Sequence, residues 1–473
     1  MQRRPTLRTR PWLLPIATAA ALSACAVGPD YERPSAAAPA AFKEAPPGAP
    51  GWFPAAPADT LERGPWWELF GDAQLNRLAA QVEVSNQNVA AAVAAYAQAR
   101  ALVAQQRATL FPTIGLNASA TRSGGGAALD TGNRLQLGAN ASWEPDIWGA
   151  LRRGVEGAQA SAQASAADLA AARLSAQGEL ATDYFALRAA DAQIALTRSS
   201  VEGYERSLKI TQDRYAAAIA AKTDVLQAQT LLDSTRANLA TLAITRAQLE
   251  HAIAVLVGKA PAEFALPAAD WNTVVPAVPL GVPSQLLQRR PDIASAERAV
   301  AAANAAIGVQ RSAYFPALTL SGSYGNAGSR VADLIGASTS LWSLGLAATQ
   351  MLFDAGATHA RVEGAEAARD AAVARYRQTV LAAFQAVEDQ LAAIRYLAEQ
   401  ADLRRSASQA ADLTEQQLLN RYKQGLVAYT DVVTAQVSAL NARSTLSQLA
   451  SSRQAAAIGL IQALGGGWHA PAP

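Results

Sequence analysis

The sequence predicts a mainly α-helical chain with a small β part, built from two copies of one unit. Two stretches, 146–260 and 317–470, contain no proline and are rich in the helix formers Ala, Leu, Gln, Arg and Glu. Motifs of the first stretch return in the second at a constant offset of 207 residues, which indicates a duplication. Two shorter segments, 113–143 and 317–353, alternate in polarity as strands do.

The composition is that of a folded protein with a sizeable core, because 51% of the 473 residues are apolar and 16% are charged. The net charge of +2 is nearly balanced, and Lys and Arg are scattered among Asp and Glu. This distribution offers no basic face for nucleic acid, so we expect no nucleic-acid partner.

The first residues have the order of a secretory signal: four arginines, an apolar stretch from Trp12 to Leu22, then LSAC at 22–25. The apolar stretch is shorter than the ~20 residues that cross a bilayer, which disfavours a permanent transmembrane anchor. LSAC resembles the bacterial lipobox, so we expect removal of a signal peptide, 1–24, and lipid attachment to Cys25. Cys25 is the only cysteine; the alternative is a spare thiol. Ala26, where inner-membrane lipoproteins carry Asp, favours the cell outer membrane.

A Pro-, Ala- and Gly-rich stretch without periodicity follows Cys25 and predicts a lipidated N-terminal strap, 25–73. Each copy then begins with an Ala-rich helix that a Phe-Pro pair ends, followed by a β-hairpin around a loop. The expected first copy is 74–258, with its helix at about 74–110 and its hairpin at about 113–143. After a linker at 259–290, the second copy is 291–464, with its helix at about 291–314, its hairpin at about 317–353, and a tail at 465–473.

The remainder of each copy predicts a long helical hairpin. A helix from about 148 to 216 would span roughly 100 Å at 1.5 Å per residue. Leu242, Leu249 and Leu256 are spaced by seven residues, as in a coiled coil. The expected tips are at about 217–223 and 424–430.

At the second tip, Gly425 offers a helix stop, and Thr430-Asp431 offers a cap and a first-turn acid for the next helix. In the first copy, Ala218 takes the place of Gly425 and Thr223-Asp224 follows. The two tips are therefore expected to have the same construction.

Four strands cannot close a transmembrane barrel alone, because single-chain barrels begin at eight strands and an open edge in hydrocarbon leaves peptide groups without partners. We therefore expect the strands to be shared among chains. A homotrimer would supply twelve strands and twelve helical columns, and cyclic symmetry would close the ring. Trp143, Trp148 and Trp342 flank the strands as candidate membrane-interface aromatics, although Trp148 could instead anchor a strand-to-helix junction. The alternative architecture is a lipid-tethered periplasmic coiled-coil scaffold.

Five motifs are spread along the chain after Cys25: DYERP (30–34), PWWELFGDAQLNRL (65–78), RRPDIASAERAVAAANAAIGVQRSAYFPALTLSGS (289–323), NRYKQGLVAYTDVVTAQ (420–436) and ALGGGW (463–468). These motifs resemble those of the TolC-type outer membrane factors, in particular the lipoprotein branch that serves resistance-nodulation-division (RND) efflux pumps. The resemblance covers essentially the whole chain after Cys25.

The resemblance implies a homotrimer with a 12-stranded transmembrane β-barrel, a long periplasmic α-helical barrel and an equatorial belt. Such a channel is a passive duct that carries drugs or other toxic small molecules across the outer membrane. Its partners are outer-membrane lipid, a periplasmic membrane fusion (adaptor) protein and an inner-membrane RND transporter. A type I secretion exit duct is the alternative, which the lipobox and the GPDYERP and GGGW signatures disfavour.

The resemblance also implies a gate at the second tip, where relatives narrow the periplasmic end with acidic residues. The matching positions are Asp431, which keeps a carboxylate, and Thr434, where relatives often carry a second acid. Three carboxylates around an axis would attract cations and repel one another; alternatively, Asp431 stabilises a helix N-terminus. Tyr422 either packs the closed gate or makes ordinary interhelix contacts. The expected adaptor contacts are Arg214, Arg421, Gly425, Leu426 and Val427.

The sequence predicts no catalytic, metal or cofactor site. His251, His359 and His469 lie far apart, without a carboxylate or Cys at ligand spacing. Acidic residues lie along helix faces, usually near Arg, as solvated pairs do. No P-loop is present to supply energy. An enzyme is therefore not expected.

Overall fold

The computed structural model describes residues 26–36, 38–44, 65–124, 132–276 and 289–466. Cys25, the predicted signal peptide and the tail after Gly466 lie outside these residues. The chain forms two compact units, each assembled from three separate stretches. Unit 1 comprises 1–35, 95–166 and 295–377, and unit 2 comprises 36–94, 167–294 and 378–473.

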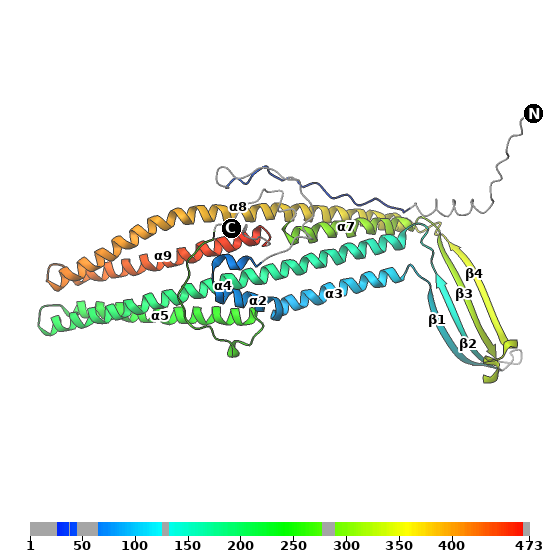
Figure 1. The fold of residues 1–473 in the computed structure, drawn as a ribbon, viewed down its shortest axis with the longest axis horizontal. Helices are drawn as coiled ribbons and strands as arrows, with labels where there is room; N and C mark the ends of the chain where they lie inside the picture. The colour runs from blue at the N-terminus through cyan, green and yellow to red at the C-terminus, as the bar shows by residue number, and fades with distance from the viewer. Residues whose placement is uncertain (1–25, 37, 45–64, 125–131, 277–288, 467–473) are drawn as a thin grey trace, which may run out of the picture. The chain divides into compact units, whose positions relative to one another are not determined.

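Unit 1 contains a four-stranded antiparallel sheet with strand order β1-β2-β3-β4 (Figure 1). The first hairpin supplies β1 and β2, the second supplies β3 and β4, and the pairing of β2 with β3 joins the two copies. The prediction of four strands per chain is confirmed. The strands are β1 Thr113–Ser123, β2 Gly132–Trp143, β3 Ala317–Gly328 and β4 Ser340–Thr349.

The helices of the two copies match in length. Each copy has helices of 22, 67 and 35 residues in the same order, and the last two form a helical hairpin (Figure 1). At 1.5 Å per residue, each 67-residue helix is about 100 Å long. The first copy has α3 Gln87–Ala108, α4 Ala150–Ala216 and α5 Lys222–Leu256; the second has α7 Pro291–Ser312, α8 Ala357–Lys423 and α9 Tyr429–Ala463.

The expectation of one helix at about 74–110 is wrong, because Asn86 divides it into α2 (Ala73–Ser85) and α3. The Asn86 amide donates to the Leu256 carbonyl (2.8 Å), and its Oδ1 accepts from the Asn88 and Val89 amides. The side chain thus caps α3 while it binds the end of α5. Asn is a weak helix former and a good cap, but its partner lies 170 residues away in the sequence.

Short 3₁₀ helices complete the fold: η2 Trp66–Phe70, η3 Pro261–Glu263, η5 Val331–Leu334 and η6 Ala337–Thr339. In unit 2, η2 and α2 form a hydrophobic core with one stretch of α4 and the end of α9. Trp66, Phe70 and Leu75 are almost completely buried there. This packing fixes Trp66 and Trp67 as core residues.

Extended residues before η2 contact both units. In unit 1, Asp30 pairs with Arg153 (2.7 Å), and the Pro29 carbonyl accepts from Asn304 on α7 (2.9 Å). In unit 2, the Glu388 carboxylate accepts from the Lys43 amide (2.7 Å). These contacts tie the segment to helices, as a strap lying on the body would require.

No helix within the described ranges is both long and apolar enough to cross a membrane.

Candidate functional site

The sheet presents one apolar face and one polar face. Paired residues in an antiparallel ladder share a face, so the register assigns every strand position to one side. The apolar rows are Leu116-Ala139-Tyr324-Trp342, Ile114-Ala141-Gly322-Leu344 and Trp143-Leu320-Leu346. The polar rows include Gly115-Asn140-Ser323-Ser343 and Thr113-Ser142-Ser321-Gly345.

The apolar face is exposed within the chain. Trp342, Leu344 and Leu346 are 77%, 74% and 70% exposed, although they are neighbours on one strand. A contiguous apolar patch of this kind would be unfavourable in water and is what lipid contact requires. On the opposite face, Ser323 and Ser343 share a hydrogen bond of 2.8 Å. The two faces therefore suit lipid on one side and an aqueous lumen on the other.

Aromatic side chains fix the junction between sheet and helices in unit 1. Trp148 stacks on Phe315 with ring centroids 4.8 Å apart, and its indole N–H donates to the Pro316 carbonyl (2.8 Å). Trp143 donates to the Leu110 carbonyl (3.0 Å). These contacts favour the junction role for Trp148, whereas exposed Trp342 stays a candidate interface residue.

The two helical tips turn in the same way. At the second tip, Gly425 has φ +78°, and the Leu426 amide donates to the Arg421 carbonyl (2.9 Å). At the first tip, Ala218 has φ +58°, and the Ile219 amide donates to the Arg214 carbonyl (2.8 Å). Ala218 thus adopts the left-handed conformation that glycine adopts more readily.

A compact aromatic core lies behind the second tip. Tyr422 is buried against Tyr429, with ring centroids 5.1 Å apart. The Arg214 guanidinium lies 4.9 Å from the Tyr422 ring and donates to the Lys423 carbonyl (3.3 Å). Tyr429 shares a 3.1 Å hydrogen bond with Ser207, and burial raises the pKa of Tyr429. Arg214 and Tyr422 therefore hold the two helical hairpins together.

The predicted gate residues lie at the start of α9. Asp431 is the third residue of the helix and is exposed. The expected Thr430 cap is wrong, because the helix begins at Tyr429, two residues before the expected start, and no side chain caps it. Asp431 is nevertheless a first-turn acid, which suits the positive end of the helix dipole. The first copy likewise has Asp224 in the first turn of α5 without a side-chain cap.

Thr434 is exposed one turn further along α9, and its hydroxyl donates to the Thr430 carbonyl (2.9 Å). It lines a groove of about 550 Å³ between α5 and α9, together with Leu226 and Val433. Of the predicted adaptor contacts, Arg421, Gly425 and Leu426 are exposed and Val427 is half-buried. The structure thus brings the predicted tip residues to one end of unit 2, where Tyr422 is buried and Arg214 is half-buried.

A family model described as "Outer membrane efflux protein" matches residues 78–259 and 282–466, once for each copy. The chain belongs to the outer membrane efflux protein family.

Similar proteins agree over almost the full length. The cation efflux system protein CusC of Escherichia coli O6:H1 is 30% identical over 97% of this chain and 99% of its own. The antibiotic efflux pump outer membrane protein ArpC of Pseudomonas putida is 30% identical over 96% of this chain and 94% of its own. The solved outer-membrane channel OprN has a TM-score of 0.85 at 30% identity, over 94% of this chain and 100% of that one.

As a member of the outer membrane efflux protein family, the chain is an outer-membrane channel of efflux systems and not an enzyme. The predicted fold class, mainly helical with four strands and an internal duplication, is confirmed. The polar sheet face is then the natural candidate for the channel wall.

Sequence reasoning missed a buried ionic network in unit 2 of this efflux channel. Asp191, only 5% exposed, pairs with Arg188 (3.0 Å) and with Arg246 (2.7 Å). Arg246 also pairs with Glu250 (3.1 Å). Glu250 accepts from the Leu266 amide, and Arg188 donates to the Pro267 carbonyl. The expectation of solvated pairs along helix faces is wrong here. The Arg188–Asp191 and Arg246–Glu250 spacings were visible in the sequence, whereas Arg246 lies 55 residues away from Asp191.

Proposed function

We propose that this efflux channel works as a homotrimer and forms the passive exit duct of a tripartite RND-type pump. A periplasmic adaptor would dock on its helical tips, and an inner-membrane RND transporter would deliver toxic small molecules to it. The observation that carries the proposal is the sheet, which has an exposed apolar face and edge strands, β1 and β4, that pair on one side only among the described residues. Three such sheets supply twelve strands and leave no edge in the membrane.

Planar-bilayer recording tests the duct directly. The purified full chain is expected to give discrete channels whose size does not depend on nucleotide, since a passive duct consumes no energy. A lipid-tethered scaffold would give no channels at any voltage. Chemical cross-linking should stop at three subunits; a dimer or a monomer as the largest product would contradict the trimer.

The exported solute is to be sought among toxic small molecules, because ArpC is named for antibiotic efflux and CusC for cation efflux. Growth of a deletion strain on panels of antibiotics, organic solvents and metal salts separates these classes. We expect the deletion strain to be sensitive to organic drugs, and a plasmid copy of the gene to restore resistance. Sensitivity to metal salts alone would mean that the exported solutes are metal cations and not organic drugs.

We propose that lipid on Cys25 tethers the strap to the outer membrane. Replacing Cys25 with serine is expected to abolish incorporation of radiolabelled palmitate and to leave residues 1–24 attached, because the thiol carries the lipid that directs cleavage. Mass spectrometry of the purified chain checks both effects. Ser23→Ala keeps a small residue before the cysteine and should retain the label. Incorporation of the label into Cys25→Ser would contradict lipid attachment at Cys25.

We propose that Asp431 forms a ring of three carboxylates that narrows the periplasmic end, with Thr434 as a neutral second ring and Tyr422 as packing behind it. Asp431→Ala is expected to raise the resting conductance and weaken block by divalent cations, because the three carboxylates that attract and hold cations at the narrow end are lost. Single-channel recording measures both quantities.

Asp224→Ala is the matched control, since Asp224 occupies the corresponding position of the first copy. It should leave conductance nearly unchanged. Equal effects of the two substitutions, or none from Asp431→Ala, would argue that both acids serve only the helix dipole.

For docking, we propose that the adaptor contacts the exposed tip residues Arg421, Gly425 and Leu426 and the half-buried Val427. Leu426 is 63% exposed although it is apolar, which suits burial by a partner. Arg214 would act indirectly, since its guanidinium lies on Tyr422 and holds the tip in shape.

A further inference from the structure

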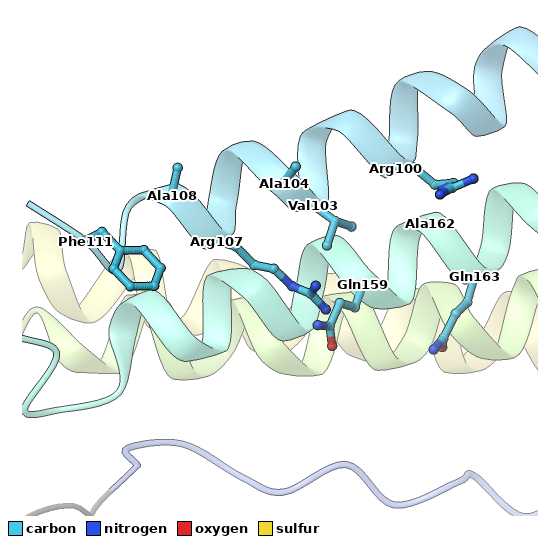
Figure 2. Close-up of a pocket in the computed structure, with 9 residues that line it drawn as sticks. All are labelled: Arg100, Val103, Ala104, Arg107, Ala108, Phe111, Gln159, Ala162 and Gln163. Atoms are coloured by element: carbon cyan, nitrogen blue, oxygen red, sulfur yellow. The ribbon is translucent and has the colours of Figure 1, made fainter. Parts of the chain in front are cut away.

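The groove between α3 and α4 in unit 1 differs in charge from its counterpart in the second copy. Its volume is about 780 Å³, and no carboxylate is among its lining residues. Figure 2 shows Arg107 extending from α3 toward Gln159 on α4, with Phe111 at the same end of the helix. Its lining residues include Arg100, Arg107, Phe111, Gln159, Ala162 and Gln163.

The duplication supplies an internal comparison for Arg107. Phe111-Pro112 corresponds to Phe315-Pro316, so Arg107 corresponds to Arg311. Arg311 pairs with Glu366 on α8 at 2.6 Å. The first-copy position that matches Glu366 at the 207-residue offset is Gln159. Arg107 therefore keeps the cation of this pair and has lost its acid.

Two neighbouring positions change in the same direction, and one, Ala162 in place of Arg369, loses a cation. Gln163 matches Asp370 of the second copy, so a second carboxylate is replaced by an amide. Arg100 stands where the second copy has Asn304, which adds a cation. Arg100 lies 5.9 Å from the Tyr96 ring centroid, and neither Arg100 nor Arg107 has an ion-pair partner among the described residues. The first-copy groove thus has two cations and no acid, whereas the matching positions of the second copy have two cations, Arg311 and Arg369, and two acids, Glu366 and Asp370.

The groove also lies next to the sheet. Phe111, 67% exposed, is two residues before the start of β1, and Arg107 is in the last turn of α3, about 6 Å from Phe111 along the helix. The lipid headgroup layer is roughly 5–8 Å thick on each side of the hydrocarbon. An aromatic ring beside a cation at this height matches the boundary between acyl chains and phosphates.

We propose that the groove between α3 and α4 binds the phosphate of an anionic phospholipid of the periplasmic leaflet, held by Arg107 with Arg100 behind it and Phe111 against the acyl chain. Phosphate and guanidinium form charge-assisted, bidentate hydrogen bonds. The matching positions of the second copy have no such role, because Arg311 already forms an ion pair with Glu366. The proposal rests on the proposed placement of the helices in the periplasm.

Native mass spectrometry of the delipidated full-length trimer, titrated with phosphatidylglycerol or phosphatidylcholine, tests the site. Wild type should retain phosphatidylglycerol preferentially. Gln159→Glu restores the acid of the second copy and should weaken phosphatidylglycerol binding about fivefold, as expected for loss of one effective cation near a membrane surface. Arg107→Gln should do the same, and it decides the outcome if Gln159→Glu does not assemble. Millimolar inorganic phosphate should not displace the lipid.

Arg369→Gln is the charge-matched control, since Arg369 pairs with Asp370 on α8 and does not line the groove. It should leave lipid retention unchanged. Equal losses in all three variants, or none in Gln159→Glu and Arg107→Gln, would overturn the proposal; displacement by inorganic phosphate would show a free-phosphate site instead. Channel conductance of the variants separates these results from failure of the duct itself, which would abolish conductance in wild type too.

Discussion

Replacing Asp191 with alanine is expected to lower the free energy of unfolding by about 3–5 kcal/mol, because it leaves the buried Arg188 and the partly buried Arg246 without their shared carboxylate. Arg188 is 3% exposed and Arg246 20% exposed, so water cannot readily replace the lost partner. Arg246 also donates to the Leu266 carbonyl (2.5 Å), so the segment after η3 should loosen from α5. Urea unfolding of the detergent-solubilised protein, followed by circular dichroism, measures the loss.

Asp213→Ala is the control for that experiment. Asp213 is also a carboxylate on α4 with an ion pair, to Lys209, but both side chains are more than 60% exposed. An exposed pair of this kind contributes roughly 0.3–0.5 kcal/mol. A similar loss for Asp191→Ala and Asp213→Ala would mean that the Asp191 network is as well hydrated as the surface pair.

Gly258→Val should cost about 3–5 kcal/mol by combining backbone strain with a steric clash. Gly258 ends α5 with φ +71°, and a Cβ there would lie 2.2 Å from the Ser85 carbonyl oxygen. Ser85 ends α2, so the close approach is between the backbones of two helix ends and no side-chain rotation relieves it. A lower thermal midpoint is the expected readout.

The matched control is Gly203→Ala in the middle of α4. A Cβ there would meet only the flexible Arg206 side chain, at 3.9 Å. Alanine in a helix interior is favoured over glycine by roughly 0.5–1 kcal/mol, so this variant should be neutral or slightly more stable. Tolerance of Gly258→Val would mean that the two helix ends can separate without loss of the fold.

The duplication made most of the fold predictable, because the features that set it are local and occur twice. Phe111-Pro112 and Phe315-Pro316 end helices in both copies, and Ala218 and Gly425 turn both tips with positive φ. What the sequence could not give is contact between distant residues. Asn86 divides a helix because its amide meets the end of α5, and Asp191 is buried because Arg246 returns to it.

The candidate site was predictable to a different degree. The position of Asp431 near a helix start follows from local sequence, but the family resemblance alone suggests a gate. The burial of Tyr422 on α8 depends on Tyr429 and Arg214, which approach it from α9 and α4. The charge of the α3–α4 groove becomes meaningful only when Gln159 is compared with Glu366, and that comparison needed the observed Arg311–Glu366 pair.

The pairing of β2 with β3 has a consequence for how the channel is made. Leu135 pairs with Gly328, so the sheet cannot be completed until nearly two hundred further residues have been exported. Closing so long a loop is slow, as for other folds of high contact order. Until then, the first hairpin exposes Ile114 and Leu116 to water beside an unpaired strand edge. The nascent channel is therefore expected to be most prone to aggregation between export of its first and second hairpins.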